Sequence, residues 1–195
     1  MPLSIPPESQ HGFDVPVSSA GQSLPGATLL NVDYIAQSPW KWLCWAACCE
    51  MVLRANNIPT TGMCQTAQLF AGASKNCCTD CSECDSAYTT PEAAYKRWHV
   101  PCDPPYGYAF SWEGLSNEIV HGGRPVEIYF LWNGGNAAHL ALAIGLHPSD
   151  QTVFVNDPYF GRGWVAYDDV LVAYHNGGVW RQSWQGIGYS LGTLS

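Results

Sequence analysis

Helical periodicity dominates the first part of the chain. Over 43–57, apolar side chains recur at spacings of three and four residues, which predicts a helix that Pro59 helps to terminate. A shorter helix is predicted over 91–98, because Thr90 can cap it and proline suits a first helical turn. A third helix is predicted over 112–120.

Farther along, the pattern changes to β-rich runs separated by turn residues. After the break at Gly122-Gly123, three strands are predicted in PVEIYFLW, HLALAIG and TVFVNDP, and the tail from Trp164 predicts one or two more with loops. A short strand is also expected over 29–35. The fold class is therefore α+β, with a helical half first and an antiparallel sheet second.

The length of the chain, 195 residues, suits one domain with a single core. We expect residues 1–28, which are rich in Pro, Ser and Gly, to form a flexible or propeptide-like arm. Residues 29–195 then form the domain, which includes a cysteine-rich insert at 64–102.

Charge and hydropathy narrow the range of partners. The formal net charge is −8 and the eight Lys and Arg residues are scattered, so no basic stripe is available for nucleic-acid phosphates or anionic lipid. No run of about 18 apolar residues appears, and the start MPLSIPPESQ lacks the features of a secretory signal. We expect no nucleic-acid binding and no membrane insertion, and a protein that is cytoplasmic or exported by a specialised secretion system.

Cys44 begins the first predicted helix. A thiol is a good nucleophile only as the thiolate, and the unpaired N–H groups and dipole of a helix N-terminus favour negative charge there. The chain has nine cysteines, an odd number, which leaves one thiol available for chemistry if the others pair. Cys44 is therefore the candidate nucleophile, and such a thiol needs a base.

The candidate base is His139, which opens one predicted strand, while Asp157 closes the next. A hairpin symmetric about residue 148 would place His139 opposite Asp157 and pair residue 141 with 155. Both side chains would then project from the same face, because their separation in sequence is even.

A carboxylate next to one imidazole nitrogen fixes the tautomer of the ring, and the other nitrogen can then take the thiol proton and return it to a leaving amine. Cys44, His139 and Asp157 together have this chemistry. If the register slips by one residue, Asn156 would orient His139 in place of Asp157.

These residues lie in motifs that resemble the papain-like cysteine peptidases of bacteria. The closest resemblance is to the branch with a Cys-Trp-Ala-Ala helix start, which includes type III effector proteases, and bacteriocin-processing peptidases are more distant relatives. The motifs occur in the family's order, from about residue 32 to 161: Gln37 followed by Cys44-Trp45-Ala46-Ala47, then Gly134-Gly135-Asn136-Ala137-Ala138-His139, then Val155-Asn156-Asp157-Pro158.

The resemblance implies a role for four residues. Cys44 would be the nucleophile, His139 the general base and acid, Asp157 the residue that orients the base, and Gln37 the side-chain donor of the oxyanion hole beside the Cys44 backbone N–H. Six residues separate Gln37 from Cys44, one more than in papain.

The remaining cysteines favour disulfides or buried thiols over a metal site, and no metal or cofactor is expected. A C-x2-C-x2-C run is present, but no second CxxC lies at the distance of a zinc ribbon. Cys48 and Cys49 are predicted to be packed thiols within the helix. The candidates for disulfide or structural roles are Cys64, Cys77, Cys78, Cys81, Cys84 and Cys102.

Three functions fit this sequence. The first is a monomeric cysteine endopeptidase that hydrolyses a protein or peptide substrate through a thioester acyl-enzyme. The second is a glutamine deamidase or transglutaminase, since the same three side chains support acyl transfer to other acceptors. The third is a non-catalytic cysteine-rich binding module: a papain-like fold kept for binding, or a cysteine-rich structural protein in which Cys44 is disulfide-bonded.

Overall fold

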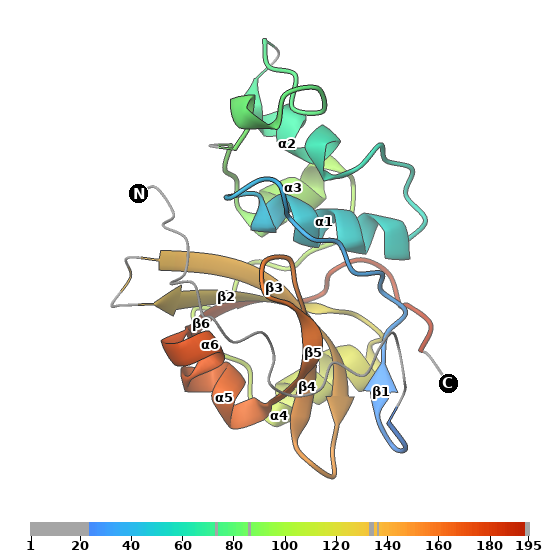
Figure 1. Ribbon diagram of the computed structural model, residues 1–195. Coiled ribbons are helices and arrows are strands. Elements are labelled where there is room, and N and C mark those ends of the chain that lie inside the picture. The colour runs from blue at the N-terminus through green and yellow to red at the C-terminus, as the bar shows by residue number, and fades with distance from the viewer. Residues whose placement is uncertain (1–23, 73, 86, 133–134, 136, 194–195) are drawn as a thin grey trace.

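A computed structural model describes residues 24–72, 74–85, 87–132, 135 and 137–193 (Figure 1). An antiparallel sheet of six strands forms its centre, in the order β5-β4-β3-β2-β6, with β1 paired to one end of β3. The α+β class predicted from the sequence is confirmed. The strands are β1 (Thr28–Leu29), β2 (Val126–Trp132), β3 (Ala137–His147), β4 (Thr152–Asp157), β5 (Gly161–Ala166) and β6 (Val179–Trp184).

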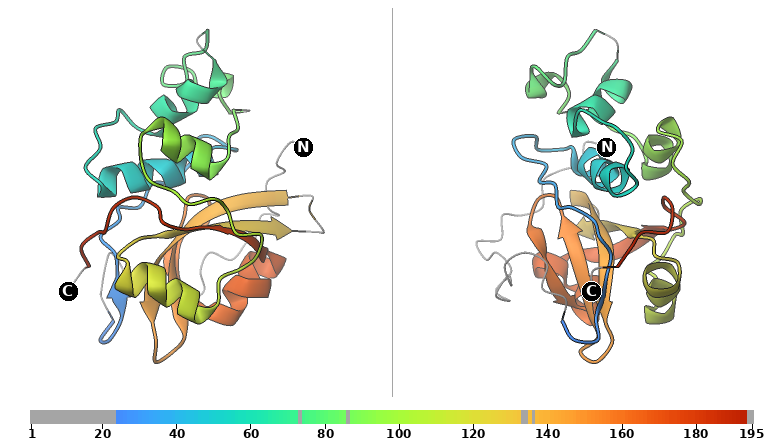
Figure 2. Two further views of the ribbon diagram at one scale, coloured as in Figure 1. Left: turned by 180° about the vertical axis from the view of Figure 1, so that it is seen from behind. Right: turned by 90° about the vertical axis from the view of Figure 1, so that its right-hand side faces the viewer.

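Helices lie on both sides of this sheet. The first three gather above it in Figure 1 and the last three below it, and the turned views of Figure 2 show the same separation. A 3₁₀ turn (Cys81–Glu83) follows α2, and a π-helical segment (Asn117–His121) continues α4. The helices are α1 (Cys44–Ala55), α2 (Met63–Ala71), α3 (Pro91–Arg97), α4 (Trp112–Ser116), α5 (Tyr167–Val172) and α6 (Tyr174–Gly177).

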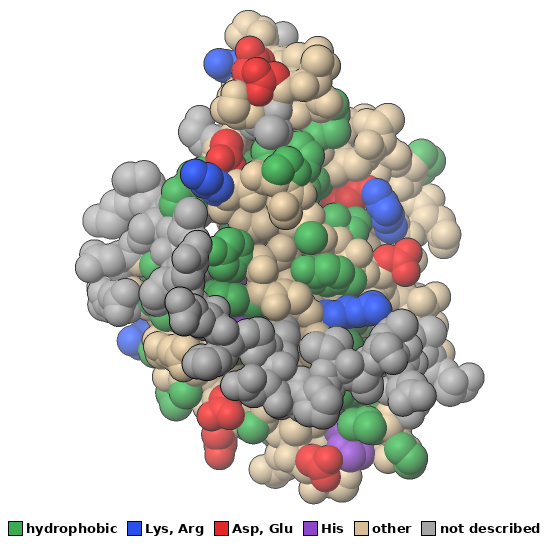
Figure 3. All heavy atoms as spheres, in the orientation of Figure 1, with side chains coloured by type: hydrophobic (Ala, Val, Ile, Leu, Met, Phe, Trp, Pro, Cys, Tyr) green, Lys and Arg blue, Asp and Glu red, His purple; other side chains and the backbone are tan. Residues whose placement is uncertain are grey.

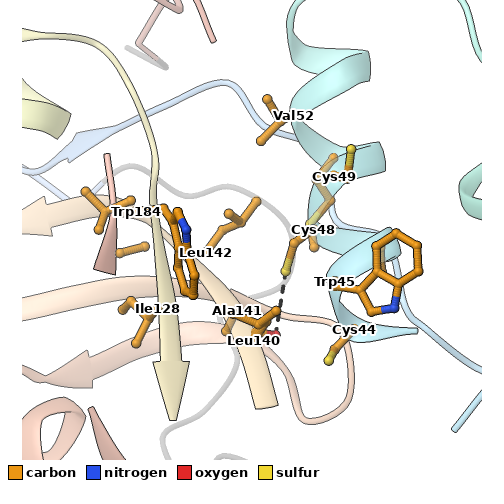
Figure 4. Packing of buried hydrophobic residues seen from close by; sticks show 14 of the residues in the cluster. Cys44, Trp45, Cys48, Cys49, Val52, Ile128, Leu140, Ala141, Leu142 and Trp184 are labelled. Carbon is orange, nitrogen blue, oxygen red and sulfur yellow. Dashed lines mark hydrogen bonds between the residues drawn. The ribbon is translucent and has the colours of Figure 1, made fainter. Parts of the chain in front are cut away.

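Packing of α1 on β3 forms the centre of the core. Every residue of β3 is buried, as are the first ten residues of α1. The Cys48 thiol lies 3.6 Å from the Leu140 carbonyl oxygen, whereas Trp45 projects from another side of the helix (Figure 4). Trp45 packs edge-on against Phe70 of α2. Cys48 and Cys49 are buried free thiols, as predicted.

The hairpin of β3 and β4 forms, but the predicted register is wrong. His147 pairs with Thr152, so the turn is centred between residues 149 and 150 and not at 148. Farther from the turn, Ala143 pairs with Val155, so the pairing of residue 141 with 155 does not occur. A β-bulge between Ala143 and Gly145 separates these two parts of the hairpin.

The bulge decides which side chains share a face. Without it, the register near the turn would set Asp157 opposite Leu142, on the face away from His139. The bulge shifts the register by one residue, so that Leu142 pairs with Asn156 and, one residue on, Asp157 comes opposite Ala141. Ala141 lies two residues from His139, so Asp157 and His139 are on the same face of the sheet. Gly145 allows β1 to lie close to β3 at this point, because a Cβ on residue 145 would lie 2.8 Å from Leu29 Cδ1.

The helices at 43–57, 91–98 and 112–120 are confirmed with small changes at their ends. The one or two strands predicted in the tail are confirmed as β5 and β6. Two details were wrong. The strand expected over 29–35 ends at Leu29, with a single further bridge from Leu30 to Thr193. In the tail, β5 gives way at Tyr167 to a helix, α5, whose two acidic residues in the first turn suit a helix start.

The cysteine-rich insert contains a helix that the sequence pattern did not predict, α2, and two disulfides. Cys64 pairs with Cys78, and Cys77 with Cys84. Cys102 is a half-buried free thiol, so of the disulfide and structural roles predicted for it, the disulfide does not form in this structure. The side chain of Cys81 lies outside the part of the structure that is described.

Most of the predicted arm, residues 1–23, also lies outside the described residues. Among those described, no helix combines the length and the apolar character needed to cross a membrane. On the face shown in Figure 3, Lys and Arg side chains lie apart from one another, and no basic patch is present on that face.

A buried carboxyl group, Glu127 of β2, lies in the core at 1% exposure. Its Oε2 accepts a hydrogen bond of 2.7 Å from the Tyr95 hydroxyl of α3. Burial raises the pKa of Glu127 to about 8, since the hydrogen bond from Tyr95 offsets only part of the cost of a buried charge.

This shift predicts a pH-dependent stability. Because the carboxyl binds its proton more tightly in the folded state, the free energy of unfolding should fall as pH rises from about 5 to 8, by at most about 1.4 kcal/mol per pH unit. Glu127→Gln should flatten this fall, and urea denaturation at pH 5, 6.5 and 8 measures it. Glu113→Gln, at an exposed site, is the control. Equal slopes in Glu127→Gln and wild type would contradict the prediction.

Candidate active site

Cys44 is the first residue of α1. Its side chain is a free thiol in a residue that is only 3% exposed, at the end of the helix that lies over β3. The structure therefore confirms the position at a helix N-terminus that the sequence predicted. It also excludes, for this structure, the disulfide-bonded Cys44 of the third hypothesis.

The structure brings His139 and Asp157 together with Cys44. The imidazole Nε2 of His139 lies 2.7 Å from Asp157 Oδ1. The Cys44 side chain interacts with the same imidazole and helps to raise its pKa, and Nδ1 is the ring nitrogen left to face the thiol. His139 is 3% exposed and Asp157 is fully buried, so water does not separate these groups.

The protonation of this pair follows from its surroundings. Burial lowers the pKa of His139, but the Asp157 carboxylate and the Cys44 side chain outweigh it and raise that pKa to about 10. Burial likewise raises the pKa of Asp157, and His139 with two backbone N–H groups outweighs this and lowers it. At neutral pH, the pair is therefore an imidazolium beside a carboxylate.

Further donors hold the carboxylate in place. Asp157 Oδ1 accepts the backbone N–H groups of Tyr159 at 2.8 Å and Phe160 at 2.9 Å, in the turn that follows β4. Asp157 Oδ2 accepts the hydroxyl of Tyr174 at 2.9 Å. Tyr174 is 1% exposed and its ring stacks on Phe130 at 4.1 Å. The sequence did not reveal Tyr174, because it lies in a stretch that the pattern assigned to strand and loop.

Asn156, the alternative partner for His139, faces another way. Its Nδ2 lies 3.3 Å from the Val32 carbonyl oxygen and 3.6 Å from the sulfur of Met51 in α1. Adjacent residues of a strand point to opposite faces, so Asn156 packs beneath α1 while Asp157 contacts His139.

Gln37 lies on the loop that leads into α1 and is 3% exposed. Its backbone N–H donates to the Pro158 carbonyl oxygen at 2.8 Å, which ties this loop to the turn after Asp157. Its side-chain Nε2 donates to the Lys41 carbonyl oxygen at 2.7 Å. Gln37 is therefore fixed between the segment that carries Asp157 and the segment that precedes Cys44.

Aromatic side chains surround the histidine. The ring centroids of Trp132 and Phe160 lie 6.5 and 6.0 Å from that of His139. Phe160 stacks on His175 at 3.8 Å, and the Trp132 Nε1 donates to the His175 carbonyl oxygen at 3.2 Å. These apolar rings exclude water from the imidazolium and its carboxylate. Within the described residues, no group of three or more His, Cys, Asp or Glu side chains could hold a metal ion.

Comparison with known proteins identifies the family. Residues 29–189 match the Peptidase_C39 like family. The chain belongs to this family. As a C39-like peptidase it is a cysteine peptidase, and the resemblance to papain-like peptidases found in its motifs is confirmed.

The fold of the C39-like peptidase is also found among solved structures. One is the crystal structure of a double glycine motif protease from an AMS/PCAT transporter in complex with the leader peptide. It superposes with a TM-score of 0.53 at 18% sequence identity, over 82% of this chain and 94% of the other. No match was found among curated proteins.

The first prediction from this site concerns the charge on His139. Asp157→Asn should lower its imidazole pKa from about 10, because burial lowers that pKa and the carboxylate no longer opposes it. NMR titration of the imidazole resonances measures this directly. The proteolytic rate at pH 7 should fall at least about 10-fold, since an analogous change in a serine triad is severe. An unchanged titration would show that Asp157 does not stabilise the imidazolium.

A second prediction concerns Tyr174. Tyr174→Phe leaves Asp157 Oδ2 without its hydroxyl partner, so the free energy of unfolding at pH 7 should fall by about 1.5–3 kcal/mol, as for hydrogen bonds to charged groups. Tyr167→Phe is a matched control, because its hydroxyl donates at 2.8 Å to the uncharged Phe110 carbonyl oxygen. Urea denaturation compares the two variants. A loss no larger in Tyr174→Phe than in Tyr167→Phe would contradict the prediction.

Proposed function

We propose that this C39-like peptidase is an endopeptidase that hydrolyses peptide bonds through a thioester acyl-enzyme. The observation that supports the proposal best is the continuous contact from Cys44, at the start of α1, through the His139 imidazole to the Asp157 carboxylate. A nucleophile, a base and a group that orients the base are thus held together in a buried site.

In the proposed reaction, the Cys44 sulfur attacks the carbonyl carbon of the scissile bond. The His139 imidazolium, which already carries the proton taken from the thiol, passes that proton to the leaving amine as the tetrahedral intermediate collapses to a thioester. Water, activated by the same imidazole, then hydrolyses the thioester and restores the thiol. Asp157 keeps Nε2 occupied throughout, so that the other ring nitrogen serves the sulfur.

The oxyanion of the intermediate needs donors placed before the reaction. We assign these to the Cys44 backbone N–H, at the helix N-terminus, and to the Gln37 side chain. Gln37 lies on the loop that precedes Cys44 and is tied by its backbone to Pro158, next to Asp157. This supports the role that the motif resemblance implied.

We propose a peptide or protein as substrate. The similar protease of known structure was solved in complex with a leader peptide. We also propose that the catalytic domain begins at about residue 29, where the family match starts. Residues 1–28 would then be an arm outside it.

The test compares wild type with Cys44→Ala and His139→Ala. We expect cleavage of a denatured protein to fall below about 10⁻³ of wild type in both variants, because a triad acts as a unit. Mass-mapped iodoacetamide labelling should favour Cys44 in wild type. Cys102, whose pKa burial and Glu127 raise, should react slowly. His147→Ala, on the same strand as His139, is the control and should remain active.

The mass spectra also separate the alternative chemistries. New termini in the substrate identify hydrolysis of peptide bonds. A gain of about 1 Da at glutamine without cleavage would replace the endopeptidase proposal with deamidation, in which an acid replaces an amide. Full cleavage activity in Cys44→Ala would refute the proposed nucleophile.

A further inference from the structure

The loop between Gln37 and Cys44 contains few internal hydrogen bonds. The Trp40 N–H donates to the Gln37 carbonyl oxygen at 2.9 Å, and Gln37 Nε2 donates to Lys41 at 2.7 Å. A further contact from Nε2 to the Trp40 carbonyl oxygen, at 3.4 Å, is too long for a full hydrogen bond. Because an amide has two N–H groups, one remains for an oxyanion.

The anchor of this loop comes from the cysteine-rich insert. Asp85 Oδ1 accepts the backbone N–H groups of Lys41 at 2.6 Å and Trp42 at 2.9 Å, from more than 40 residues away in sequence. Both bonds end on one carboxylate oxygen, and hydrogen bonds to a charged acceptor are about twice as strong as neutral ones. The loop is thus held just before Cys44 by a residue outside it.

Asp85 is itself held on both sides. It follows Cys84, which is fully buried and disulfide-bonded to Cys77. Two residues later, the Ala87 N–H donates to the Cys84 carbonyl oxygen at 2.8 Å, and the Ala87 carbonyl oxygen accepts the Trp45 indole N–H at 3.1 Å. The insert therefore bonds both to the loop and to the helix that carries the nucleophile.

From these contacts we infer that Asp85 is a positioning residue for the oxyanion hole. It fixes the Lys41 N–H, the Lys41 carbonyl oxygen fixes the Gln37 amide, and Gln37 is the proposed oxyanion donor. The inference rests on the proposed function. It gives the disulfide-bonded insert a role in catalysis, which is to hold the loop before α1 in the shape that presents Gln37.

The test measures kcat and KM on labelled denatured casein and the rate of Cys44 alkylation by iodoacetamide. Asp85→Ala should lower kcat by about 10- to 100-fold, somewhat less than loss of an oxyanion donor itself, and change KM by less than about twofold. The alkylation rate should stay within about twofold of wild type, because alkylation develops no oxyanion.

Two further variants make the comparison specific. Asp85→Asn retains an oxygen that can accept both N–H groups, so it should lose less activity than Asp85→Ala. If Asp85→Ala does not fold, Asp85→Asn replaces it in the test. A lower kcat with an unchanged alkylation rate in Asp85→Asn then supports the inference, and a wild-type kcat in Asp85→Asn refutes it. Asp80→Ala is the matched control, because Asp80 is an exposed residue of the same insert whose carboxylate accepts hydrogen bonds from Ser82, two residues away.

A double-mutant cycle with Gln37→Ala decides whether Asp85 acts through Gln37. We expect Asp85→Ala to lower kcat by less than about threefold in the Gln37→Ala background, since the donor that it positions is already absent. Equal effects in both backgrounds, or alkylation that slows as much as cleavage, would overturn the inference. Wild-type kcat in Asp85→Ala with low kcat in Gln37→Ala would overturn it and leave the proposed function intact. Activity in Cys44→Ala would instead overturn the proposed function.

Discussion

The buried ion pair between His139 and Asp157 is the interaction on which the site depends. Removing two charges from water is costly, and Coulomb attraction repays that cost only when hydrogen bonds satisfy the remaining lone pairs. Asp157 meets this condition with two backbone N–H groups and the Tyr174 hydroxyl. The turn after β4 and the stacking of Tyr174 on Phe130 are therefore part of the site, although neither touches the nucleophile.

The distance from nucleophile to base depends on how α1 lies on β3. Cys44 and Cys48 are one turn apart and share a face of the helix. Cys48 contacts the carbonyl oxygen of Leu140, and Leu140 is the neighbour of His139 along β3. A buried thiol without catalytic function thus sets the height of the helix above the strand. A larger side chain at Cys48 would lift Cys44 away from the imidazole.

The sequence predicted which residues form the site better than it predicted how the fold brings them together. Periodicity located α1, and β-rich runs between turn residues located the three central strands, because both patterns depend on local residue types alone. The meeting of His139 with Asp157 was expected from an even separation, but the pairing depends on a bulge near Gly145, which leaves no mark in the alternation of apolar residues. Tyr174 and Asp85 reach the site through tertiary contacts, from elements that no local pattern connects with Cys44.

Three of the free thiols, Cys48, Cys49 and Cys102, do not threaten the disulfides of the insert. Exchange of a disulfide needs attack by a thiolate, so its rate depends on how easily a nearby thiol loses its proton. Burial raises the pKa of Cys48 and Cys49 well above the usual range, and the acidic side chains of Glu127 and Glu92 add to the effect of burial on Cys102. These thiols remain protonated at neutral pH and do not attack the disulfides of the insert. The disulfides of the insert, which carries the Asp85 that holds the loop, are therefore protected from attack by these three thiols.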